Sequence, residues 1–256
     1  MVFGFEEDKL QIIINMKIKL QYLATGTGRC GTNYIARFLT HAGIMCGHEA
    51  IFDYHGLIHA LRRLQGNMPI FTSDCSQRDS LRGRSIQKWF DPEKIKAECS
   101  YLAAPFLNEE FLSGVKLIHV IRNPLETLSS FVLDVNFLND KQMDQLPWRT
   151  FVLNHMPEIK EEKSIIEKTC RYIMGWNNMI EKSNLEKIKV RIEEYPYTNM
   201  LNFLNIKKDQ DLLPNKKINS WKRRNRNLSL EEIPSGKTRD EFVNFMKENG
   251  YSYITL

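Results

Sequence analysis

The chain has 256 residues, of which 42% are hydrophobic and 26% charged, values that are ordinary for one soluble α/β domain spanning residues 1–256. It contains no stretch apolar enough for a membrane span, no secretory leader and no Cys-x-x-Cys pair among its five cysteines, so we expect a cytoplasmic protein without a disulfide framework. The net charge of +5 is mild and the sequence has no recognisable nucleic-acid-binding module, which argues against a nucleic-acid partner.

Apolar, strand-like runs alternate with helical patterns after a weakly patterned start at 1–16, which we expect to be a loosely ordered extension. This alternation predicts a parallel sheet that is covered by helices on both faces and wound right-handed. In chain order the predicted elements are strand 17–25, a glycine loop with a helix to about 41, a short strand and loop in 43–52, helix 55–64, strand 69–73, a loop with a short helix in 77–98, strand 115–121, a helix from 124, an irregular excursion in 134–147, helix 160–183, strand 187–192, helix 196–205, a turn-rich stretch in 207–234 and helix 239–248.

The glycine loop after the first strand is the most informative stretch of the sequence. Gly26, Gly28 and Gly31 fall within six positions, between an apolar strand and a helical pattern. In such an arrangement the backbone N–H groups of the loop converge on an anion, and the helix N-terminus adds partial positive charge. Because Arg29 adds a full positive charge inside the loop, the stretch predicts a site for a phosphate-type group.

Two nucleotide-binding motifs fit this loop incompletely. Gly26, Gly28 and Gly31 match the dinucleotide fingerprint, but the acidic partner that it requires is found only as Glu49, in a Gly-His-Glu loop. Gly26 and Gly31 also have the spacing of a nucleotide-triphosphatase loop, but Thr32 stands where that motif has lysine. Without that lysine, β- and γ-phosphates and Mg²⁺ would be held poorly. A small-molecule or nucleotide kinase is therefore an alternative interpretation.

A second block, residues 115–132, follows the same plan of strand and then helix. Its apolar strand ends at Arg122, and Asn123-Pro124 is the signature of a capped helix start. Ser130 lies eight residues after Arg122, two turns into this helix. A guanidinium can bind two phosphate oxygens at once and the serine hydroxyl can donate a further hydrogen bond, so this pair predicts a second anion-binding position.

Together the two blocks resemble the cofactor-binding motifs of the sulfotransferase family. The run Arg29-Cys30-Gly31-Thr32-Asn33-Tyr34 resembles the family's 5′-phosphosulfate loop, with Asn33 at a position that mostly carries a hydroxyl. The run 121–131, with Arg122 and Ser130, resembles the motif that binds the 3′-phosphate. Shorter stretches at 98–106, 172–181 and 190–195 also look like parts of the family, most similar in character to bacterial and tyrosine-protein sulfotransferases.

This resemblance implies a P-loop nucleotide-kinase-like, three-layer α/β sandwich with a central parallel sheet. It also implies transfer of a sulfuryl group from 3′-phosphoadenosine 5′-phosphosulfate (PAPS) to a hydroxyl or amine, which releases adenosine 3′,5′-bisphosphate (PAP) and needs no metal. Arg29 would also stabilise the leaving phosphate, and we expect Arg29 and Arg122 to form two cationic positions, one cofactor length apart along a shared sheet edge. The cofactor-binding residues implied are Gly28, Arg29, Cys30, Gly31, Thr32, Asn33, Tyr34, Arg122 and Ser130.

The catalytic base is open between three residues. Glu49 is favoured, because the stretch around it resembles tyrosine-protein sulfotransferases, which place a glutamate in a similar loop. His48 is the alternative, and Asp74 is a third candidate. Cytosolic family members carry a catalytic histidine in the loop before the second block, where this chain has Cys-Ser-Tyr at 99–101.

Two further groups of residues have competing interpretations. The basic segment 221–227 loosely resembles the family's loop that closes over the 3′-phosphate, with Lys222, Arg223 and Arg224 as cofactor ligands, but a solvated basic loop explains the same charges. His55 and His59 lie four apart on a predicted helix. Because no spacing in the chain matches a structural zinc site, we expect no metal.

The acceptor is the least defined part of the prediction. Segments 48–60, 74–105 and 134–158 are expected to line its site and carry several tryptophans, tyrosines and histidines. Aromatic rings beside polar groups suit a sugar or glycolipid, and also a phenol or a peptide tyrosine. The sequence leaves open which small molecule, glycan or lipid is the acceptor, and it leaves the oligomeric state open. A non-catalytic nucleotide-binding module is the alternative outside the enzymes.

Overall fold

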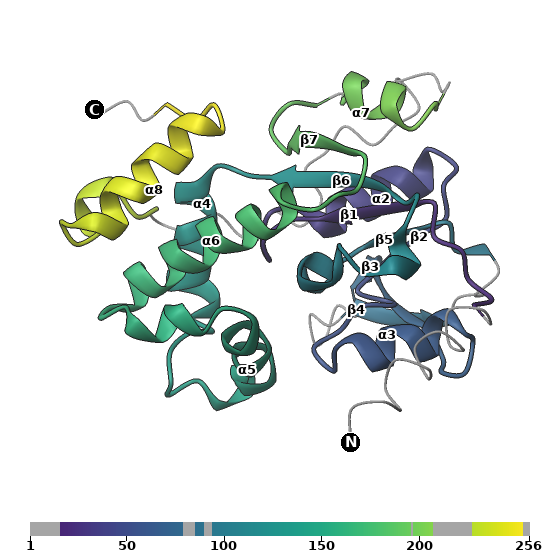
Figure 1. Cartoon of the computed structure of the whole chain (residues 1–256), viewed down its shortest axis with the longest axis horizontal. Coiled ribbons are helices and arrows are strands. Elements are labelled where there is room, and N and C mark those ends of the chain that lie inside the picture. Colours follow the sequence, from purple (N-terminus) through teal and green to yellow (C-terminus); the bar gives the residue numbers. More distant parts are fainter. Residues whose placement is uncertain (1–15, 79–84, 90–93, 196, 207–226, 253–256) are drawn as a thin grey trace.

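The computed structural model describes residues 16–78, 85–89, 94–195, 197–206 and 227–252, and its centre is a parallel sheet (Figure 1). All neighbouring strands of this sheet are parallel, so the predicted parallel arrangement is confirmed. The sheet has five strands in the order β2-β5-β1-β6-β7, namely β1 (Tyr22–Thr25), β2 (Cys46–His48), β5 (Ala97–Cys99), β6 (Lys116–Ile121) and β7 (Lys187–Arg191).

Helices cover both faces of the sheet, as the sequence predicts. Alternate side chains of a strand enter different cores: on β1, Leu23 packs into one and Ala24 into the other. One core is closed by α2 (Thr32–His41) and α7 (Thr198–Phe203). The other is closed by α3 (Leu57–Leu64), α4 (Pro124–Ser129), α5 (Leu146–His155), α6 (Ile165–Glu181) and α8 (Lys237–Glu248).

The chain crosses from one side of β1 to the other between β5 and β6. Strands β2 and β5 lie on one side of β1, and β6 and β7 lie on the other. In open parallel sheets, ligands bind beyond the carboxyl ends of the strands at such a crossing point. The glycine loop follows β1 and Arg122 follows β6, so both blocks identified in the sequence lie at this position.

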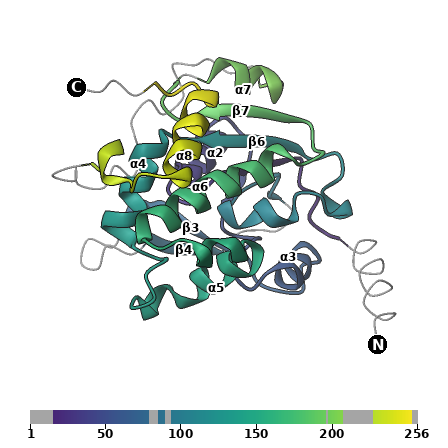
Figure 2. The same ribbon diagram turned by 60° about the vertical axis from the view of Figure 1, so that its left-hand side comes forward.

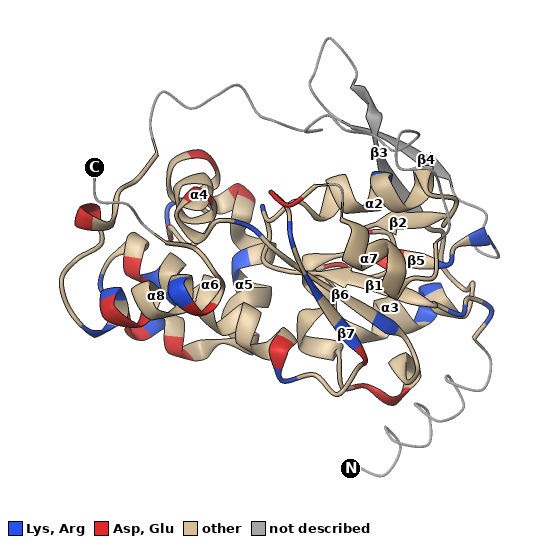
Figure 3. Ribbon diagram, turned by 90° about the horizontal axis from the view of Figure 1, so that it is seen from above, with Lys and Arg blue, Asp and Glu red and all other residues tan. Residues whose placement is uncertain are grey.

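The last helix is fixed to the long helix α6, and the two lie side by side (Figures 1 and 2). Arg171 on α6 forms ion pairs with Glu162 (2.9 Å) and with Glu241 of α8 (2.6 Å), and it donates to Thr238 Oγ1. Charges of both signs line α8 (Figure 3). The C-terminal helix therefore combines an apolar face, in which Phe242 is buried, with a specific ionic attachment.

The prediction for residues 69–98 is wrong in two respects. The strand there is longer and forms a hairpin, because β3 (Phe71–Arg78) pairs antiparallel with β4 (Ser85–Trp89) outside the central sheet. Asp74 consequently lies within a strand instead of after one. The second error is β5, three residues long, which the sequence analysis places in a loop. Its sequence Ala-Glu-Cys is too short and too polar to stand out as an apolar run.

Other elements differ from prediction mainly at their ends. The first strand begins at Tyr22 instead of Lys17, and α3 begins at Leu57 instead of His55. A helix that the sequence analysis misses, α5, begins at the end of the predicted excursion and continues to His155, and Pro147 lies in its first turn, where proline is well tolerated. The segment 101–106 forms a 3₁₀-helix.

Two composition-based expectations can be compared with this structure. Four of the cysteines, Cys30, Cys46, Cys99 and Cys170, are buried free thiols. Within the described part of the chain, no helix combines the length and the apolar character that crossing a bilayer requires.

Candidate active site

The glycine loop turns sharply from β1 into α2. Arg29 and Gly31 have positive φ angles of 68° and 107°, a region that favours glycine. An added Cβ on Gly31 would lie 2.8 Å from Ile192 Cγ1, and one on Gly26 would overlap the carbonyl oxygen of Val120 on β6. These two glycines are therefore required, one by the turn and one by the close approach of the neighbouring strand.

An aromatic group lies against the loop at Gly28. The backbone N–H of Gly28 donates to Tyr172 Oη at 3.2 Å, and burial raises the pKa of that hydroxyl well above its usual range. A Cβ on Gly28 would lie 3.1 Å from Trp148 Cζ2 and 3.2 Å from Phe131 Cζ. Trp148 in turn stacks on Phe137 with ring centroids 4.2 Å apart. The glycine loop is thus packed against a layer of aromatic side chains.

The two sequence blocks meet in direct contact. Arg29 Nε donates to Ser130 Oγ at 3.0 Å, and Ser130 Oγ donates to Asp134 Oδ2 at 3.2 Å. Arg122 Nη1 donates to the backbone carbonyl of Arg29 at 3.2 Å. The Arg29 side chain thus reaches the serine of the expected second position, and the expected spacing of the two guanidiniums by one cofactor length stays a prediction. Arg29, Arg122 and Ser130 form one contiguous group, which we call the arginine–serine group.

The guanidinium of Arg122 binds the carboxylate of Glu126. Both Nε (3.1 Å) and Nη2 (2.7 Å) donate to Glu126 Oε2, one helical turn further on. The helix start is capped as predicted, since Asn123 Oδ1 accepts from the backbone N–H groups of Leu125 and Glu126. Both partners of the ion pair are partly exposed, so it contributes little to stability, but Glu126 would compete with an incoming anion for the guanidinium.

Thr32, His48 and Glu49 form a second polar cluster at the same end of the sheet. Thr32 Oγ1, in the first turn of α2, lies 3.3 Å from His48 Nε2 at the end of β2. The same ring nitrogen lies 3.8 Å from Glu49 Oε1. Burial lowers the pKa of His48, partly opposed by the negative charge of Glu49, so the ring is neutral near pH 7. Glu49 is the most exposed of the three, with 38% of its side chain accessible, and has a positive φ of 53°.

A buried carboxyl group that the sequence analysis misses supports this cluster. Glu98 on β5 is fully buried, and its Oε1 accepts from the backbone N–H groups of Ala50 (2.7 Å) and Ile51 (3.0 Å). Burial is the largest cause that raises its pKa, to about 8. The carboxyl therefore fixes the turn that follows Glu49. A lone glutamate in a three-residue strand carries no motif, so only the pairing of β5 with β2 identifies this role.

Some predicted site residues have side chains that are unsuited to chemistry. Cys30 is buried, and burial raises its pKa to about 12, so it stays a thiol. The ring of Tyr34 packs against Phe38 and Tyr197 in the core beneath α2. Only their backbone groups are candidates for contact with a ligand. Asn33, between them and partly buried, lies in the first turn of α2.

The Cys-Ser-Tyr run at 99–101 has structural contacts. Cys99 is buried, and burial raises its pKa well above the usual range. Ser100 Oγ donates to the carbonyl of Phe52, and the carbonyl of Tyr101 accepts from Trp176 Nε1. These contacts therefore attach the end of β5 to the loop at Phe52 and to helix α6.

Other predicted residues cannot be placed. Lys222, Arg223 and Arg224 lie outside the described residues, and the side chain of Asp74 is not described. The described chain resumes at Asn227, the last residue of this segment, and the backbone N–H of Leu228 donates to Ser129 Oγ at 2.8 Å. The chain that follows the basic segment is therefore attached to the helix that leads to Ser130.

Comparison with known proteins adds no family to this geometry. A scan against protein-family models and a search among curated proteins found no match for the chain. The function is therefore inferred from the site itself.

Proposed function

We propose that the chain is a sulfotransferase that uses PAPS, with a P-loop nucleotide-kinase-like fold and a cytoplasmic location. The observation that supports this most is the contact between the glycine loop and the helix that follows β6, through Arg29 and Ser130. It brings the residues of both family-like motifs into one site at the carboxyl ends of adjacent strands. That arrangement suits an anion with two phosphate groups better than one with a single group.

In this proposal the loop binds the 5′-phosphosulfate and the helix after β6 binds the 3′-phosphate. Arg29, Thr32 and the backbone N–H groups of residues 30–33 hold the 5′ side and stabilise the charge that develops on the leaving phosphate oxygen. Arg122 exchanges its contact with Glu126 for one with the 3′-phosphate, and Ser130 turns its hydroxyl from Asp134 to donate to the same group. Gly28 and Asn33 border the loop and would approach the cofactor through their backbones.

The transfer itself exchanges one S–O bond for another. The acceptor oxygen attacks sulfur, the bond from sulfur to the bridging phosphate oxygen breaks, and PAP leaves with the electron pair of that bond. The acceptor proton passes to a base, for which Glu49 is the favoured residue. His48, neutral through burial, lies between Thr32 and Glu49 and would keep the glutamate near the glycine loop. His48 is also the second candidate for the base.

A carbohydrate or glycolipid is the acceptor class that we favour. Trp148, the partly exposed ring against Gly28, supplies a flat apolar surface of the kind that packs on sugar rings, while Phe131 is buried beneath it. The polar cluster at Glu49 would then face the acceptor hydroxyl. A phenol would use the same ring.

We include the basic segment 221–227 in the proposal as a lid over the 3′-phosphate, with Lys222, Arg223 and Arg224 as ligands. The support is the hydrogen bond from Leu228 to Ser129, which ties the end of this segment to the helix of Ser130.

Ligand-dependent thermal unfolding tests the cofactor, and labelled transfer tests the reaction. Stabilisation by PAP but not by ATP–Mg²⁺ supports the sulfotransferase, whereas the opposite result supports the kinase. Incubation with labelled PAPS and a panel of glycans, lipids and phenols then identifies the acceptor. In the Glu49→Gln variant turnover should be lost while PAP still stabilises the protein. PAP binding without transfer to any acceptor would favour a non-catalytic module.

A further inference from the structure

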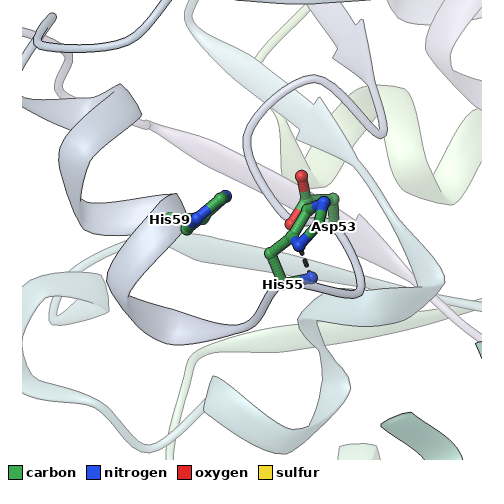
Figure 4. Close-up of side chains that lie close together, drawn as sticks. All are labelled: Asp53, His55 and His59. Atoms are coloured by element: carbon green, nitrogen blue, oxygen red, sulfur yellow. Dashed lines mark hydrogen bonds between the residues drawn. The ribbon is translucent and has the colours of Figure 1, made fainter. Parts of the chain in front are cut away.

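A second group of potential ligands lies at the start of α3, in the loop that follows β2. Figure 4 shows Asp53, His55 and His59 close together there. One carboxylate oxygen and one ring nitrogen from each histidine all lie within 4.8 Å of one another. The spacing of the two histidines alone does not identify a metal site, because the third ligand precedes the helix and is brought in by the turn at Gly56.

Asp53 is held in place by groups that leave it able to bind a cation. Its Oδ2 forms an ion pair with Arg63 Nη2 at 2.7 Å, and Arg63 Nη1 also donates to the carbonyl of Ile51 at 3.1 Å. Its Oδ1 accepts only from the backbone N–H of His55, at 2.9 Å among the described contacts. A carboxylate oxygen has a second lone pair, so Oδ1 can take a metal while Arg63 keeps Oδ2 oriented.

His59 carries the observation that points to a ligand. Its Nδ1 is buried and has no hydrogen-bond partner among the described residues. A buried ring nitrogen without a partner costs free energy, which a bound cation would recover. The ring of His59 stacks on that of His55 with centroids 4.5 Å apart and an angle of 27° between the planes. The two rings therefore lie next to each other, and each would turn about its side-chain bonds to direct a nitrogen lone pair at one ion.

We propose that Asp53, His55 and His59 bind one divalent transition-metal ion of the zinc class. Two imidazoles and one carboxylate are a ligand set that suits Zn²⁺, Co²⁺ or Ni²⁺ better than Mg²⁺ or Ca²⁺. Three protein ligands leave a fourth position open for water or another ligand. This site uses none of the residues assigned to PAPS, so it stands or falls separately from the proposed function.

Titration of the metal-free, full-length protein with ZnCl₂ tests the site. We expect one saturable equivalent in calorimetry, and with CoCl₂ a visible spectrum of nitrogen and oxygen ligation without thiolate charge transfer. His59→Ala should lower the affinity at least about tenfold, and Arg63→Ala, which releases Asp53, should lower it by about tenfold or more. The control is His41→Ala, which removes an exposed histidine at the end of α2 and should leave binding unchanged.

His55→Asn keeps the test valid if His59→Ala unfolds, because His55 is exposed and its replacement leaves the core intact. Far-ultraviolet circular dichroism reports folding for each variant. Absence of saturable binding to the wild-type protein would overturn the proposal, and so would equal affinity in the wild type and in His55→Asn. Thiolate charge transfer in the cobalt spectrum would also overturn it, because it would assign the metal to cysteines.

Discussion

Arg29 Nε donates a hydrogen bond to Ser130 Oγ across 3.0 Å, although the two residues are 101 positions apart in the chain. The contact exists because β1 and β6 are adjacent and parallel, so the segments that follow them emerge at the same edge of the sheet. It makes one site out of two motifs that the sequence presents separately.

Replacing Glu126 with glutamine should strengthen the binding of PAP. Glu126 Oε2 accepts two hydrogen bonds from Arg122 and thereby competes with a phosphate for the guanidinium. The neutral amide competes less well, so we expect the affinity for PAP to rise about threefold to tenfold, with a smaller gain at high salt. Calorimetric titration at two salt concentrations measures both effects. Glu110→Gln removes the same charge from an exposed position and should change the affinity little; an equal gain in that control would contradict the role of Glu126.

Gly31→Ala should weaken both the fold and the site. The substitution puts a side chain at a φ of 107° and 2.8 Å from Ile192, which should cost about 1–3 kcal/mol of unfolding free energy. It should also reduce PAP binding, because the loop's N–H groups would shift. Gly43→Ala is the matched control, since Gly43 has a φ of 94° with open space around it in the described structure. Chemical denaturation should show a smaller loss for Gly43→Ala, and PAP binding should be unchanged there.

Glu98→Gln should flatten the dependence of stability on pH. The folded-state pKa of Glu98 is raised, mainly by burial, to about 8 from a usual value of 4.5. Between these values the unfolded chain is ionised while the folded chain stays protonated, so wild-type stability falls as pH rises, by up to about 1.4 kcal/mol per unit. The glutamine amide oxygen can accept from Ala50 and Ile51 without titrating. Urea denaturation from pH 5 to 9 should show the variant gaining on the wild type as pH rises; parallel profiles would contradict this role.

Glu181 should stabilise the folded state at neutral pH and lose this contribution at acid pH. Its pKa is lowered to about 2, chiefly by the hydrogen bond with His119 (3.1 Å) and then by Lys189. Its contribution to stability is therefore present above about pH 4.5 and is lost as pH falls toward 2. Glu181→Gln should be less stable than the wild type at pH 7, and its melting temperature should fall less as the pH is lowered below 4.5. If the melting temperatures of the two proteins fall equally, the contacts of Glu181 with His119 and Lys189 do not contribute to stability.

Local signals in the sequence account for the parts of the fold that were predicted correctly. The apolar run before Arg122, the Asn123-Pro124 cap and the glycines at 26–31 each act over a few neighbouring residues, and each produces the expected element. The central parallel sheet follows from their alternation. The glycine-loop candidates and Arg122 with Ser130 could likewise be named in advance.

What sequence reasoning misses depends on partners that are distant in the chain. Glu98 lies in a strand of three residues whose identity comes only from its position between β2 and β1. Its function depends on two backbone amides nearly fifty positions earlier. The contact of Arg29 with Ser130 is likewise absent from local sequence signals, because it depends on the left-handed backbone at residue 29 and on the pairing of β1 with β6.

The most direct measurement of the central claim is a double-mutant cycle for PAP binding with Arg29→Ala, Arg122→Ala and the double variant, by calorimetry at fixed salt. In the proposed complex each guanidinium makes charge-assisted hydrogen bonds to the same PAP molecule, so each single change should weaken binding about tenfold or more. The two effects should also be non-additive, since the Arg29 side chain contacts Ser130, which would bind the 3′-phosphate together with Arg122. Unaltered PAP affinity in both single variants, or no saturable binding to the wild type, would contradict a bisphosphate site at the arginine–serine group.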